Sequence, residues 1–534
     1  MDLAVKMTLI NIYPAVTKAH YLLSSYVLKG YLDKYFSNTI SLNVEVMNFS
    51  NKIDPLDISK SIHKLEPHII GFSCYIWNIE LVVDTINKLI DVSSFTYILG
   101  GPEISLNRIK TLKIQSESAY FVIGEGEKVL LKLLKFIVSY GKRDSASLPD
   151  GVAVMKKDAI IFSPNTDKLK DLDEVPSVYL NGVVEDKLYK YQQVFLETQR
   201  GCNFKCKYCV YHKDLPSIIT YSEERILNEI KFLILEKHVT AIRIIDAVFS
   251  NNIDRAKRIA LFLNHIKNDN NIRLPWIYWE FTYNCVDDEF FRLISELKCR
   301  DNILNSNSLK PKDRIQSYGE MLKDYTVVNA VGIQSLRADS LRLVNRPPVN
   351  IKRLETFFES VKQYNIVLKI DIIIGLPLKT FKSYFDGLEY LLQFFKDTDH
   401  ILNIHCLQIL PGSDMEKVAE ENGINYSISA PHIIYSTSSF SETELNYASK
   451  LSAILFRIVN SPIRARFYAT KEKSGNTFFS LIERVYNLLI DSKDFSGTYF
   501  LRNNLVDDEY WNGNIYKDLP SSWLIDILDN NIKS

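Results

Sequence analysis

The stretch LETQRGCNFKCKYCVYH, residues 196–212, decides how the rest of this chain is interpreted. It holds Cys202, Cys206 and Cys209 in CxxxCxxC spacing, directly after an apolar run that is typical of a β-strand. These three are among seven cysteines in 534 residues, too few for a disulfide framework in a chain of this length. Thiolates are the usual ligands of iron–sulfur clusters, so the clustering indicates a metal or redox site.

Three thiolates would bind three irons of a four-iron cluster and leave the fourth iron open to a small molecule. A cluster used only for electron transfer would normally have a fourth cysteine nearby, and Cys74, Cys285, Cys299 and Cys406 are all distant in the sequence. The alternative is a structural zinc site with His212 as the fourth ligand. Zinc ligands usually form two pairs far apart in the sequence, so the spacing favours the cluster.

Composition limits the class of protein. Apolar residues make up 46% and charged residues 24%, which predicts ordinary packed cores. Lys plus Arg and Asp plus Glu both number 64, and this balance argues against a general nucleic-acid binder. No apolar run approaches the ~20 residues needed to cross a bilayer, and the first residues lack the order of a signal peptide. We therefore expect a cytoplasmic protein without a membrane partner.

The N-terminal part alternates strand-like and helix-like segments. Apolar runs at 7–13, 42–49, 69–74, 96–99 and 121–123 predict five strands of a parallel, doubly wound, Rossmann-like sheet. We expect this domain to span residues 1–140. Residues 141–190 are less regular and contain a hairpin pattern, and we expect them to form a linker.

A second alternating series follows the linker. Its apolar runs lie at 194–198, 241–245, 276–281, 327–333, 367–374 and 402–410. Six βα units predict a partial barrel over residues 191–415, with an extra loop and helix in the polar gap around 302–323. Residues 416–534 have a mainly helical pattern, and we expect this region to close the mouth of the barrel. The predicted fold class is therefore α/β.

A CxxxCxxC loop after the first strand of a six-unit partial barrel resembles the radical S-adenosylmethionine (SAM) superfamily. The resemblance implies that the open iron chelates SAM, which is cleaved on reduction to methionine and a 5′-deoxyadenosyl radical. It also implies a set of SAM-binding positions. The residues of this chain at those positions are Tyr208, Asp246, Glu280, Gln334, Ser335, Arg346, Gly375 and Leu410.

The matching motifs follow the cysteine loop in the family's order. Residues 332–335 resemble the GxQS segment, and Arg346 stands where relatives have an arginine for the SAM carboxylate. Residues 371–377 resemble the segment along the adenosine, and 410–412 the segment near the adenine. After the second strand the family often has a GGE-like stretch, and here only the acidic group of Asp246 matches.

A doubly wound domain ahead of such a barrel resembles the cobalamin-binding radical SAM class, over about residues 1–130 and 185–415. Glycines at strand ends would let a large ring or its nucleotide tail approach the backbone. The positions that the resemblance assigns to cobalamin are Ser73, Trp77, Gly100, Gly101, Pro102, Glu103, Gly124, Glu125 and Gly126.

The chain departs from many cobalamin domains at the lower cobalt ligand. The DxHxxG motif is absent, and residues 13–20 read YPAVTKAH. Either cobalamin binds with no histidine from the protein, or the site has been lost. Trp77 is the candidate to cover the lower cobalt face, which would favour the Co(I) state. The alternative is that Trp77 packs under a helix, and we expect His20 to be structural.

The resemblance implies methylation of an unactivated carbon in a small metabolite or peptide, through a 5′-deoxyadenosyl radical and methylcobalamin. An electron donor such as flavodoxin or ferredoxin would be the partner. A rearrangement, cyclisation or ring contraction without methyl transfer is the alternative, and a non-catalytic cobalamin or iron–sulfur sensor is a third reading. The cofactors expected are cobalamin, a [4Fe–4S] cluster and SAM, and the sequence assigns no further catalytic residue.

Overall fold

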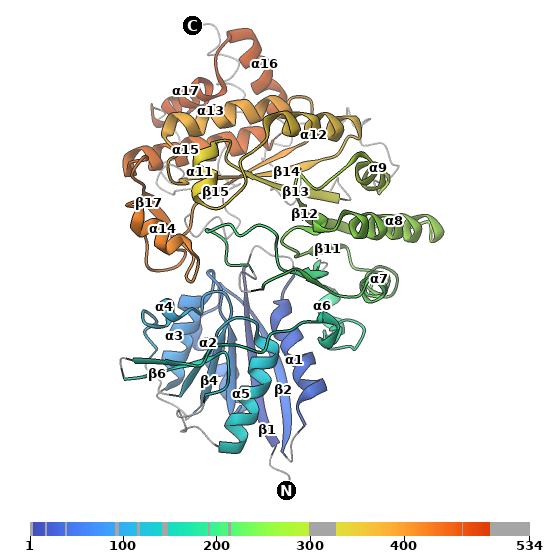
Figure 1. The fold of residues 1–534 in the computed structure, drawn as a ribbon, viewed down its shortest axis with the longest axis vertical. Helices are drawn as coiled ribbons and strands as arrows, with labels where there is room; N and C mark the ends of the chain where they lie inside the picture. Colours follow the sequence, from blue (N-terminus) through green and yellow to red (C-terminus); the bar gives the residue numbers. More distant parts are fainter. Residues whose placement is uncertain are drawn as a thin grey trace.

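The structure is a computed structural model. It describes residues 4–15, 19–37, 40–90, 95–114, 118–140, 148–157, 159–190, 193–211, 215–297, 327–461 and 463–491. An N-terminal α/β domain and a second α/β domain are stacked along the long axis, and the C-terminal helices lie at the far end (Figure 1). The expected gap segment at 302–323, and residues 492–534 of the expected C-terminal region, lie outside the described residues.

The N-terminal sheet has the strand order β2-β1-β3-β4-β5-β6-β7 in the described chain. Strands β1 to β5 are parallel, as the spacing of the apolar runs predicts. The strands are β1 (Ala4–Tyr13), β2 (Ser41–Ser50), β3 (Ile69–Ser73), β4 (Thr96–Gly100), β5 (Ala119–Val122), β6 (Val152–Lys156) and β7 (Ala159–Phe162).

Helices cover both faces of this sheet, because side chains alternate between the faces along each buried strand. One face packs against α2 and α3, with Ile10 and Ile70 in the core. The other face packs against α1 and α5, with Met7 and Leu9 in the core. The helices of this domain are α1 (Leu23–Tyr35), α2 (Pro55–Leu65), α3 (Ile79–Ile90), α4 (Leu106–Ile109) and α5 (Gly126–Tyr140).

The hairpin that we expected within a linker belongs to the N-terminal sheet instead. β6 pairs antiparallel with β5, with Val122 opposite Val152, and β7 pairs with β6. The pairing covers an edge of β5 that would otherwise present unpaired backbone groups. The segment that crosses to the second domain therefore begins after Phe162, and it contains the short helix α6 (Asp186–Tyr189).

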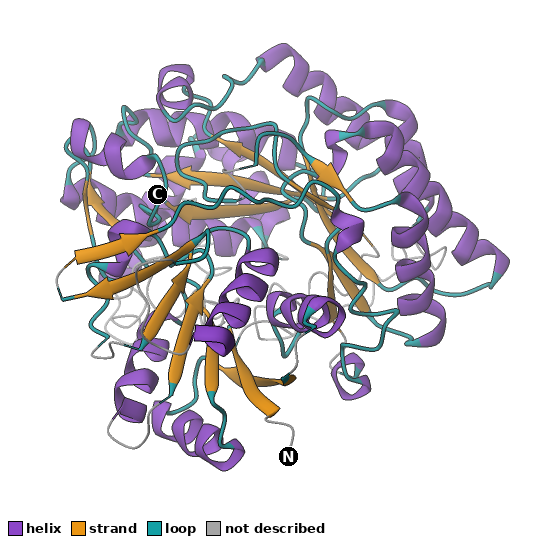
Figure 2. Cartoon of the chain, turned by 60° about the horizontal axis from the view of Figure 1, so that its bottom comes forward, coloured by secondary structure: helices purple, strands orange, loops and turns teal. Residues whose placement is uncertain are grey.

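The second domain is an open parallel sheet with the order β15-β14-β13-β12-β11-β8. All six expected strands form, although the last ends at Cys406 rather than near residue 410. The helices lie on the outer side of the strands (Figure 2). The strands are β8 (Gln193–Leu196), β11 (Ala241–Ile244), β12 (Trp276–Phe281), β13 (Val327–Gln334), β14 (Leu368–Ile374) and β15 (Ile401–Cys406).

The sequence specifies the limits of several barrel helices through their first turns. Asn350 accepts a hydrogen bond from the Arg353 backbone, and Thr380 forms a capping box with Ser383. Two short strands adjoin the cysteine loop in the sequence, β9 (Gln199–Arg200) and β10 (Ile219–Thr220). The described helices of the barrel are α7 (Glu223–Lys231), α8 (Ile253–Asp269), α9 (Asp288–Glu296), α11 (Ala338–Leu343), α12 (Ile351–Gln363) and α13 (Phe381–Leu392). A π-helical turn, Phe232–Glu236, extends α7.

The C-terminal region is mainly helical as far as it is described. Its long helix α15 packs against β15 and α13 and so covers the end of the barrel sheet. The elements are α14 (Met415–Glu421), β16 (Asn425–Tyr426), β17 (Ile434–Ser436), α15 (Glu442–Val459), α16 (Arg464–Ser474) and α17 (Phe478–Asp491).

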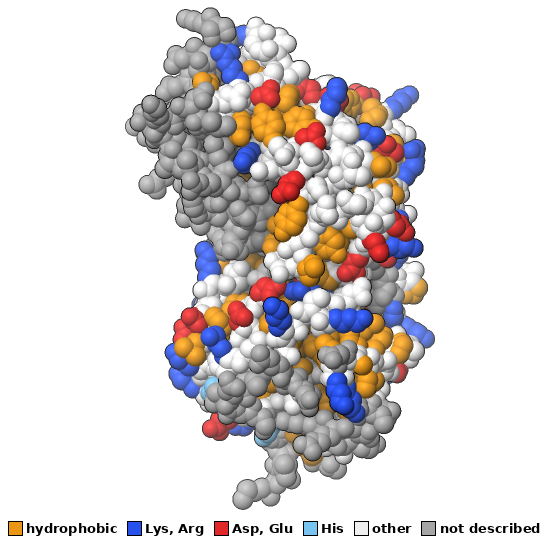
Figure 3. All heavy atoms as spheres, turned by 90° about the vertical axis from the view of Figure 1, so that its left-hand side faces the viewer, with side chains coloured by type: hydrophobic (Ala, Val, Ile, Leu, Met, Phe, Trp, Pro, Cys, Tyr) orange, Lys and Arg blue, Asp and Glu red, His pale blue; other side chains and the backbone are white. Residues whose placement is uncertain are grey.

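Two surface properties bear on the expected partners. None of the helices in the described ranges is long and apolar enough to span a bilayer. On the face shown in Figure 3, acidic and basic side chains are interspersed. That distribution agrees with the equal numbers of acidic and basic residues in the whole chain.

Candidate functional site at the domain junction

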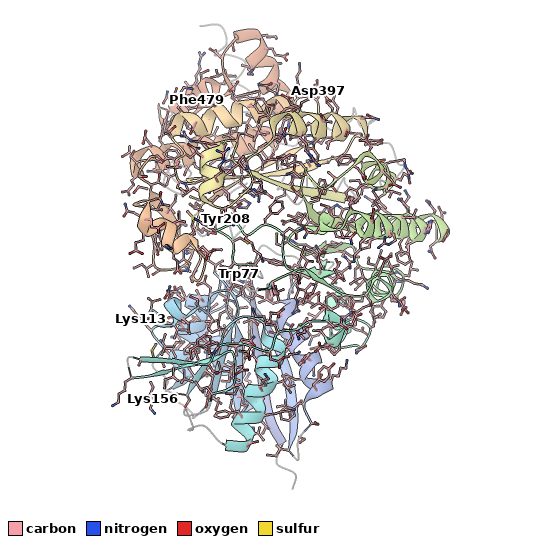
Figure 4. All side chains as sticks on the ribbon, viewed as in Figure 1. Trp77, Lys113, Lys156, Tyr208, Asp397 and Phe479 are labelled. Atoms are coloured by element: carbon pink, nitrogen blue, oxygen red, sulfur yellow. The ribbon has the colours of Figure 1, made fainter. Side chains whose placement is uncertain are left out.

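A cavity of about 760 Å³ lies between the two domains. Its N-terminal wall is formed by the carboxyl ends of the parallel strands, where doubly wound sheets bind ligands. Its opposite wall comes from the barrel, including Cys209, Tyr211 and Ile245. Figure 4 shows Trp77 at the top of the N-terminal domain with Tyr208 above it. The predicted cobalamin positions that line the cavity are Ser73, Trp77, Gly100, Gly101, Pro102, Gly124 and Gly126.

The Trp77 side chain is held in a defined orientation on this wall. Its indole nitrogen donates a hydrogen bond to the Ile12 carbonyl oxygen at 3.1 Å. Its ring stacks on Tyr75, with centroids 4.5 Å apart and planes 9° apart. Trp77 therefore presents a fixed aromatic face at the cavity. His20 stacks on Tyr13 instead, with ring centroids 5.3 Å apart, in line with the structural role we expected.

The backbone conformation and packing at position 101 require glycine, independently of any ligand. Its φ of +115° lies in a region that side chains rarely adopt. A Cβ atom at Gly101 would lie 2.5 Å from the Cys74 carbonyl oxygen. The glycine therefore lets the ends of β3 and β4 approach each other, and this contact shapes the cavity wall.

Two predicted cobalamin positions do not line the cavity, and we withdraw both as direct contacts. Glu103 is 2% exposed, and its carboxylate lies 3.1 Å from His432 Nε2 and 3.6 Å from Arg108 Nε. Glu125 pairs with Arg200 at 3.1 Å. A buried carboxylate needs such partners, so both side chains join the two domains instead.

The cysteine loop is fixed by backbone contacts on both sides. Gly201 has φ +98°, and a Cβ there would lie 3.0 Å from the Ser217 carbonyl oxygen. The Lys207 amide donates to the Val344 carbonyl oxygen at 2.9 Å. The Asn345 side-chain amide donates to the Lys205 carbonyl oxygen at 2.9 Å. The barrel thus holds the loop against the helix pair that follows β13.

The donor set of the loop fits an iron–sulfur cluster. Cys206 is buried, and Arg346 Nη1 lies 3.6 Å from its sulfur, so a positive charge faces the loop. Burial raises the pKa of the Cys202 thiol. Among the described residues, no three His, Cys, Asp or Glu side chains meet at a single-metal site. A four-iron cluster binds each cysteine at a different iron, so it needs thiols around a space. His212, the alternative zinc ligand, lies outside the described residues.

Arg346 and Gln334 form the polar side of the space beside the loop. Arg346 Nη1 lies 3.5 Å from the Tyr208 hydroxyl, and Nη2 bonds the Gly332 carbonyl oxygen. Gln334 has φ +65°, and its Oε1 is buried without a hydrogen-bond partner among the described residues. A Cβ at Gly332 would lie 2.5 Å from Gln334 Nε2, so this glycine makes room for the glutamine. An orphaned acceptor beside a guanidinium suits a ligand with both ammonium and carboxylate groups.

Three other predicted SAM positions have different environments. Ser335 is buried, and its hydroxyl accepts a hydrogen bond from the Arg337 amide at 3.1 Å. Gly375 has φ +86°, and a Cβ there would lie 2.3 Å from Ile434, so packing against β17 requires the glycine. Leu410 lines the cavity. Burial raises the pKa of the Tyr208 hydroxyl, which therefore stays protonated.

Asp246 supports the barrel rather than facing the ligand space, and we withdraw it as a SAM contact. One of its carboxylate oxygens accepts from the Thr198 amide at 2.8 Å and from the Gln199 amide at 3.2 Å. The other lies 2.5 Å from the Thr198 hydroxyl. Arg255 donates to that hydroxyl at 2.9 Å. Burial raises the pKa of Asp246 to about 7.

The barrel interior carries a polar cluster around Asp371. Lys369 Nζ lies 2.7 Å from Asp371 Oδ1, the Asn403 amide donates to it at 2.5 Å, and His405 Nε2 is 3.3 Å away. Burial alone would raise the pKa of Asp371, but Lys369 and His405 hold it well below its ordinary value. Burial raises the pKa of Glu280, whose carboxylate accepts from the Tyr278 hydroxyl at 3.0 Å. The sequence signal that we missed is the alternation of polar and apolar residues along β14 and β15.

A second unpredicted feature is a buried ion cluster around Arg200. All three guanidinium nitrogens face carboxylates, those of Glu125, Glu127 and Glu197. The two carboxylates at the start of α5 belong to the N-terminal domain, and Glu197 follows β8. No local sequence signal identifies this cluster, because its members come together only through domain packing.

Comparisons with known proteins agree with this architecture. Residues 22–134 match the family described as "B12 binding domain", and residues 196–391 match "Radical SAM superfamily". The chain is 23% identical over 360 residues to "Cobalamin-dependent radical SAM methyltransferase TokK" of Streptomyces tokunonensis, covering 66% of this chain and 48% of that protein. It is 22% identical over 371 residues to "2-(S-pantetheinyl)-carbapenam-3-carboxylate methyltransferase" of Streptantibioticus cattleyicolor, covering 66% of this chain and 49% of that protein. The chain thus spans about half the length of these curated relatives.

Solved structures share the fold. A structure of the cobalamin-dependent S-adenosylmethionine radical enzyme OxsB, with aqua-cobalamin and SAM bound, has a TM-score of 0.61 at 15% identity, covering 99% of this chain and 80% of that one. The radical SAM methyltransferase TsrM from Kitasatospora setae, with cobalamin and a [4Fe–4S] cluster bound, has a TM-score of 0.57 at 15% identity, covering 78% of this chain and 75% of that one. The expected fold class, a Rossmann-like domain followed by a partial barrel and a helical region, is confirmed.

Proposed function

We propose that this chain, which belongs to the cobalamin-binding radical SAM enzymes, methylates an unactivated carbon of a small metabolite or peptide. The observation that carries the proposal is the junction cavity, about 760 Å³ in volume and lined by both domains. The strand ends of the B12-binding domain form one wall, and the cysteine loop of the radical SAM domain contributes Cys209 to the other. A substrate in this cavity would lie between the two cofactor sites.

The cofactors of this architecture are cobalamin, a [4Fe–4S] cluster and SAM, which are the groups bound in the TsrM and OxsB structures. When bound, cobalamin would supply the methyl group, and the cluster with SAM would supply the 5′-deoxyadenosyl radical. Cys202, Cys206 and Cys209 would hold the cluster. The apolar residues of the cavity wall, such as Leu9, Leu22 and Val27, would limit the access of water to a carbon radical formed there.

The side chains beside the loop suit the methionine part of SAM. The Arg346 guanidinium, fixed by the Gly332 carbonyl oxygen, would bind the carboxylate in a charge-assisted pair. Gln334 Oε1, buried without a partner in the described chain, would accept from the amino group. Glu280 and Asp371, which face the barrel interior, are the carboxylates that would accept from the ribose hydroxyls. These roles follow the order of the sequence motifs.

Trp77 is proposed as the residue beneath the cobalt. Its side chain is oriented by Ile12 and Tyr75, and no histidine from a DxHxxG motif is available in this sequence. A lower face without a strong ligand would favour Co(I), the state that attacks the methyl group of SAM. A flavodoxin or ferredoxin would supply the electrons for that state and for the cluster.

The test is anaerobic reconstitution with iron, sulfide and hydroxocobalamin, followed by addition of SAM and titanium(III) citrate. We expect about four irons and one cobalamin per chain, with release of both S-adenosylhomocysteine and 5′-deoxyadenosine. The Cys206→Ala variant should lose the cluster and 5′-deoxyadenosine, while Cys285→Ala, a cysteine outside the loop, should keep both. Release of 5′-deoxyadenosine without S-adenosylhomocysteine would exclude methyl transfer and favour a rearrangement. Tetrahedral zinc in the loop would exclude the proposal altogether.

A further inference from the structure

Arg200 connects the two halves of the candidate site through ion pairs with Glu125 and Glu127, and it also pairs with Glu197 in its own segment. Its Nη1 lies 3.1 Å from Glu125 Oε1, its Nη2 lies 2.7 Å from Glu127 Oε1, and its Nε lies 3.1 Å from Glu197 Oε1. The Arg200, Glu125 and Glu127 side chains are 5–7% exposed. Arg200 Nε lies equally close to Glu197 Oε2, which also accepts a hydrogen bond from the Tyr221 hydroxyl at 3.1 Å.

Arg200 lies directly beside the cysteine loop, so this ion cluster is at the edge of the candidate cluster site. Arg200 precedes Gly201 and Cys202, so it is the last residue before the cysteine loop. It belongs to β9, which pairs with β10 and thereby fixes the backbone at the start of the loop. Glu125 and Glu127 flank Gly126, the first residue of α5, and Gly126 lines the cavity. One guanidinium thus holds the loop and the opposite cavity wall together.

The chemistry favours a rigid connection over a loose contact. A guanidinium presents its donors in a fixed planar fork, so three carboxylates around it define a single arrangement. Pairs excluded from water are poorly screened, and removing one partner leaves a charge without compensation. Lysine could keep the charge but not the fork.

We propose that Arg200 is a positioning residue that sets the cysteine loop and the cobalamin wall at a fixed separation, so that SAM on the barrel can reach cobalt on the other domain. This inference rests on the proposed function. S-adenosylhomocysteine forms only when SAM meets cobalamin across the junction, whereas 5′-deoxyadenosine forms from the cluster and SAM within the barrel. The ratio of the two products therefore reports on the junction, and the yield of 5′-deoxyadenosine by itself reports on the cluster and its loop.

The experiment compares Arg200→Lys and Glu125→Gln with Arg255→Lys. Arg255 is also 6% exposed, but its hydrogen bonds go to Thr198 within the barrel, and among the described residues none reaches the N-terminal domain. With SAM and titanium(III) citrate, Arg200→Lys should lower the ratio of S-adenosylhomocysteine to 5′-deoxyadenosine by roughly tenfold, since small misplacements of reacting groups have large effects. Glu125→Gln should lower it by less, and Arg255→Lys should change both products together.

Hydrogen–deuterium exchange of the cofactor-free proteins provides a readout independent of turnover. Arg200→Lys should raise exchange at both 124–129 and 199–202, whereas Arg255→Lys should raise it only within the barrel. Glu125→Gln, a neutral isostere, is informative even where Arg200→Lys fails to fold. An unchanged product ratio in Glu125→Gln, with exchange changes confined to the barrel, would overturn the inference. A wild-type protein that releases no S-adenosylhomocysteine would refute the proposed function, and the exchange data would then decide about Arg200 separately.

Discussion

Replacing Asp246 with asparagine should stabilise the protein more at pH 8 than at pH 5. Burial raises the pKa of this carboxyl from 3.8 to about 7 in the folded protein. The folded state therefore binds the proton more tightly than the unfolded state. The stability that this proton contributes is fully present below the unfolded pKa and is lost as the pH rises through the folded pKa.

The magnitude follows from the interval between the two pKa values. Each pH unit within it changes the free energy of unfolding by about 1.36 kcal/mol. From pH 5 to pH 7 the wild-type protein should lose about 2.3 kcal/mol from this group, because half of it is ionised at the folded pKa, and about 0.3 kcal/mol more by pH 8. Asparagine cannot ionise, and its Oδ1 can still accept from the Thr198 and Gln199 amides. The stability difference between variant and wild type should therefore shift by about 2 to 3 kcal/mol in favour of Asp246→Asn.

The assay is urea unfolding of both proteins at pH 5, 7 and 8, followed by tryptophan fluorescence, since the buried Trp279 lies in β12 of the same barrel. Asp339→Asn is the control. The ion pair with Arg337, at 2.8 Å, holds the pKa of Asp339 below its ordinary value, so this carboxyl is ionised in both the folded and the unfolded protein over this pH range. Its substitution should cost the same stability at every pH tested. An equal effect of Asp246→Asn at pH 5 and pH 8 would show that Asp246 is ionised throughout and refute the reasoning.

Three further substitutions test the cavity and the SAM side. Gly101→Ala should lower the stability by about 1–3 kcal/mol, because φ is +115° and the new Cβ would meet the Cys74 carbonyl oxygen; Gly182→Ala, with φ +67° and open space around it, should lose less in the same thermal melt. Gln334→Leu should weaken SAM binding by roughly 1–3 kcal/mol, measured by calorimetry on the reconstituted protein, and unchanged affinity would remove Gln334 from the site. Trp77→Ala should retain the cluster but make Co(I) harder to reach, and an unaltered Co(II)/Co(I) potential would show that Trp77 only packs.

The parallel strands were predictable because strands covered on both faces are continuous apolar runs. β5, with the sequence AYFV and every residue buried, is an example. The cysteine loop was predictable because its three ligands are local in sequence. The roles of Glu103, Glu125 and Asp246 could not be predicted from the sequence, because each side chain depends on a partner that lies far along the chain. Glu103 pairs with His432, 329 residues away. An acidic residue after a strand has the same sequence pattern whether it contacts a ligand or an arginine.

Two separate attachments flank the junction cavity. Arg200 joins the cysteine loop to α5, and the Glu103–His432 pair joins the end of β4 to the segment after β15. Near the second attachment, Arg108 Nη1 lies 3.4 Å from the Ile428 carbonyl oxygen, and a Cβ at Gly412 would lie 3.1 Å from Ser105. One attachment would leave a hinge, whereas two attachments at different strand ends oppose rotation of one domain against the other. Because both consist of buried side chains, the relative position of the two cofactor walls is set by folding, before any ligand binds.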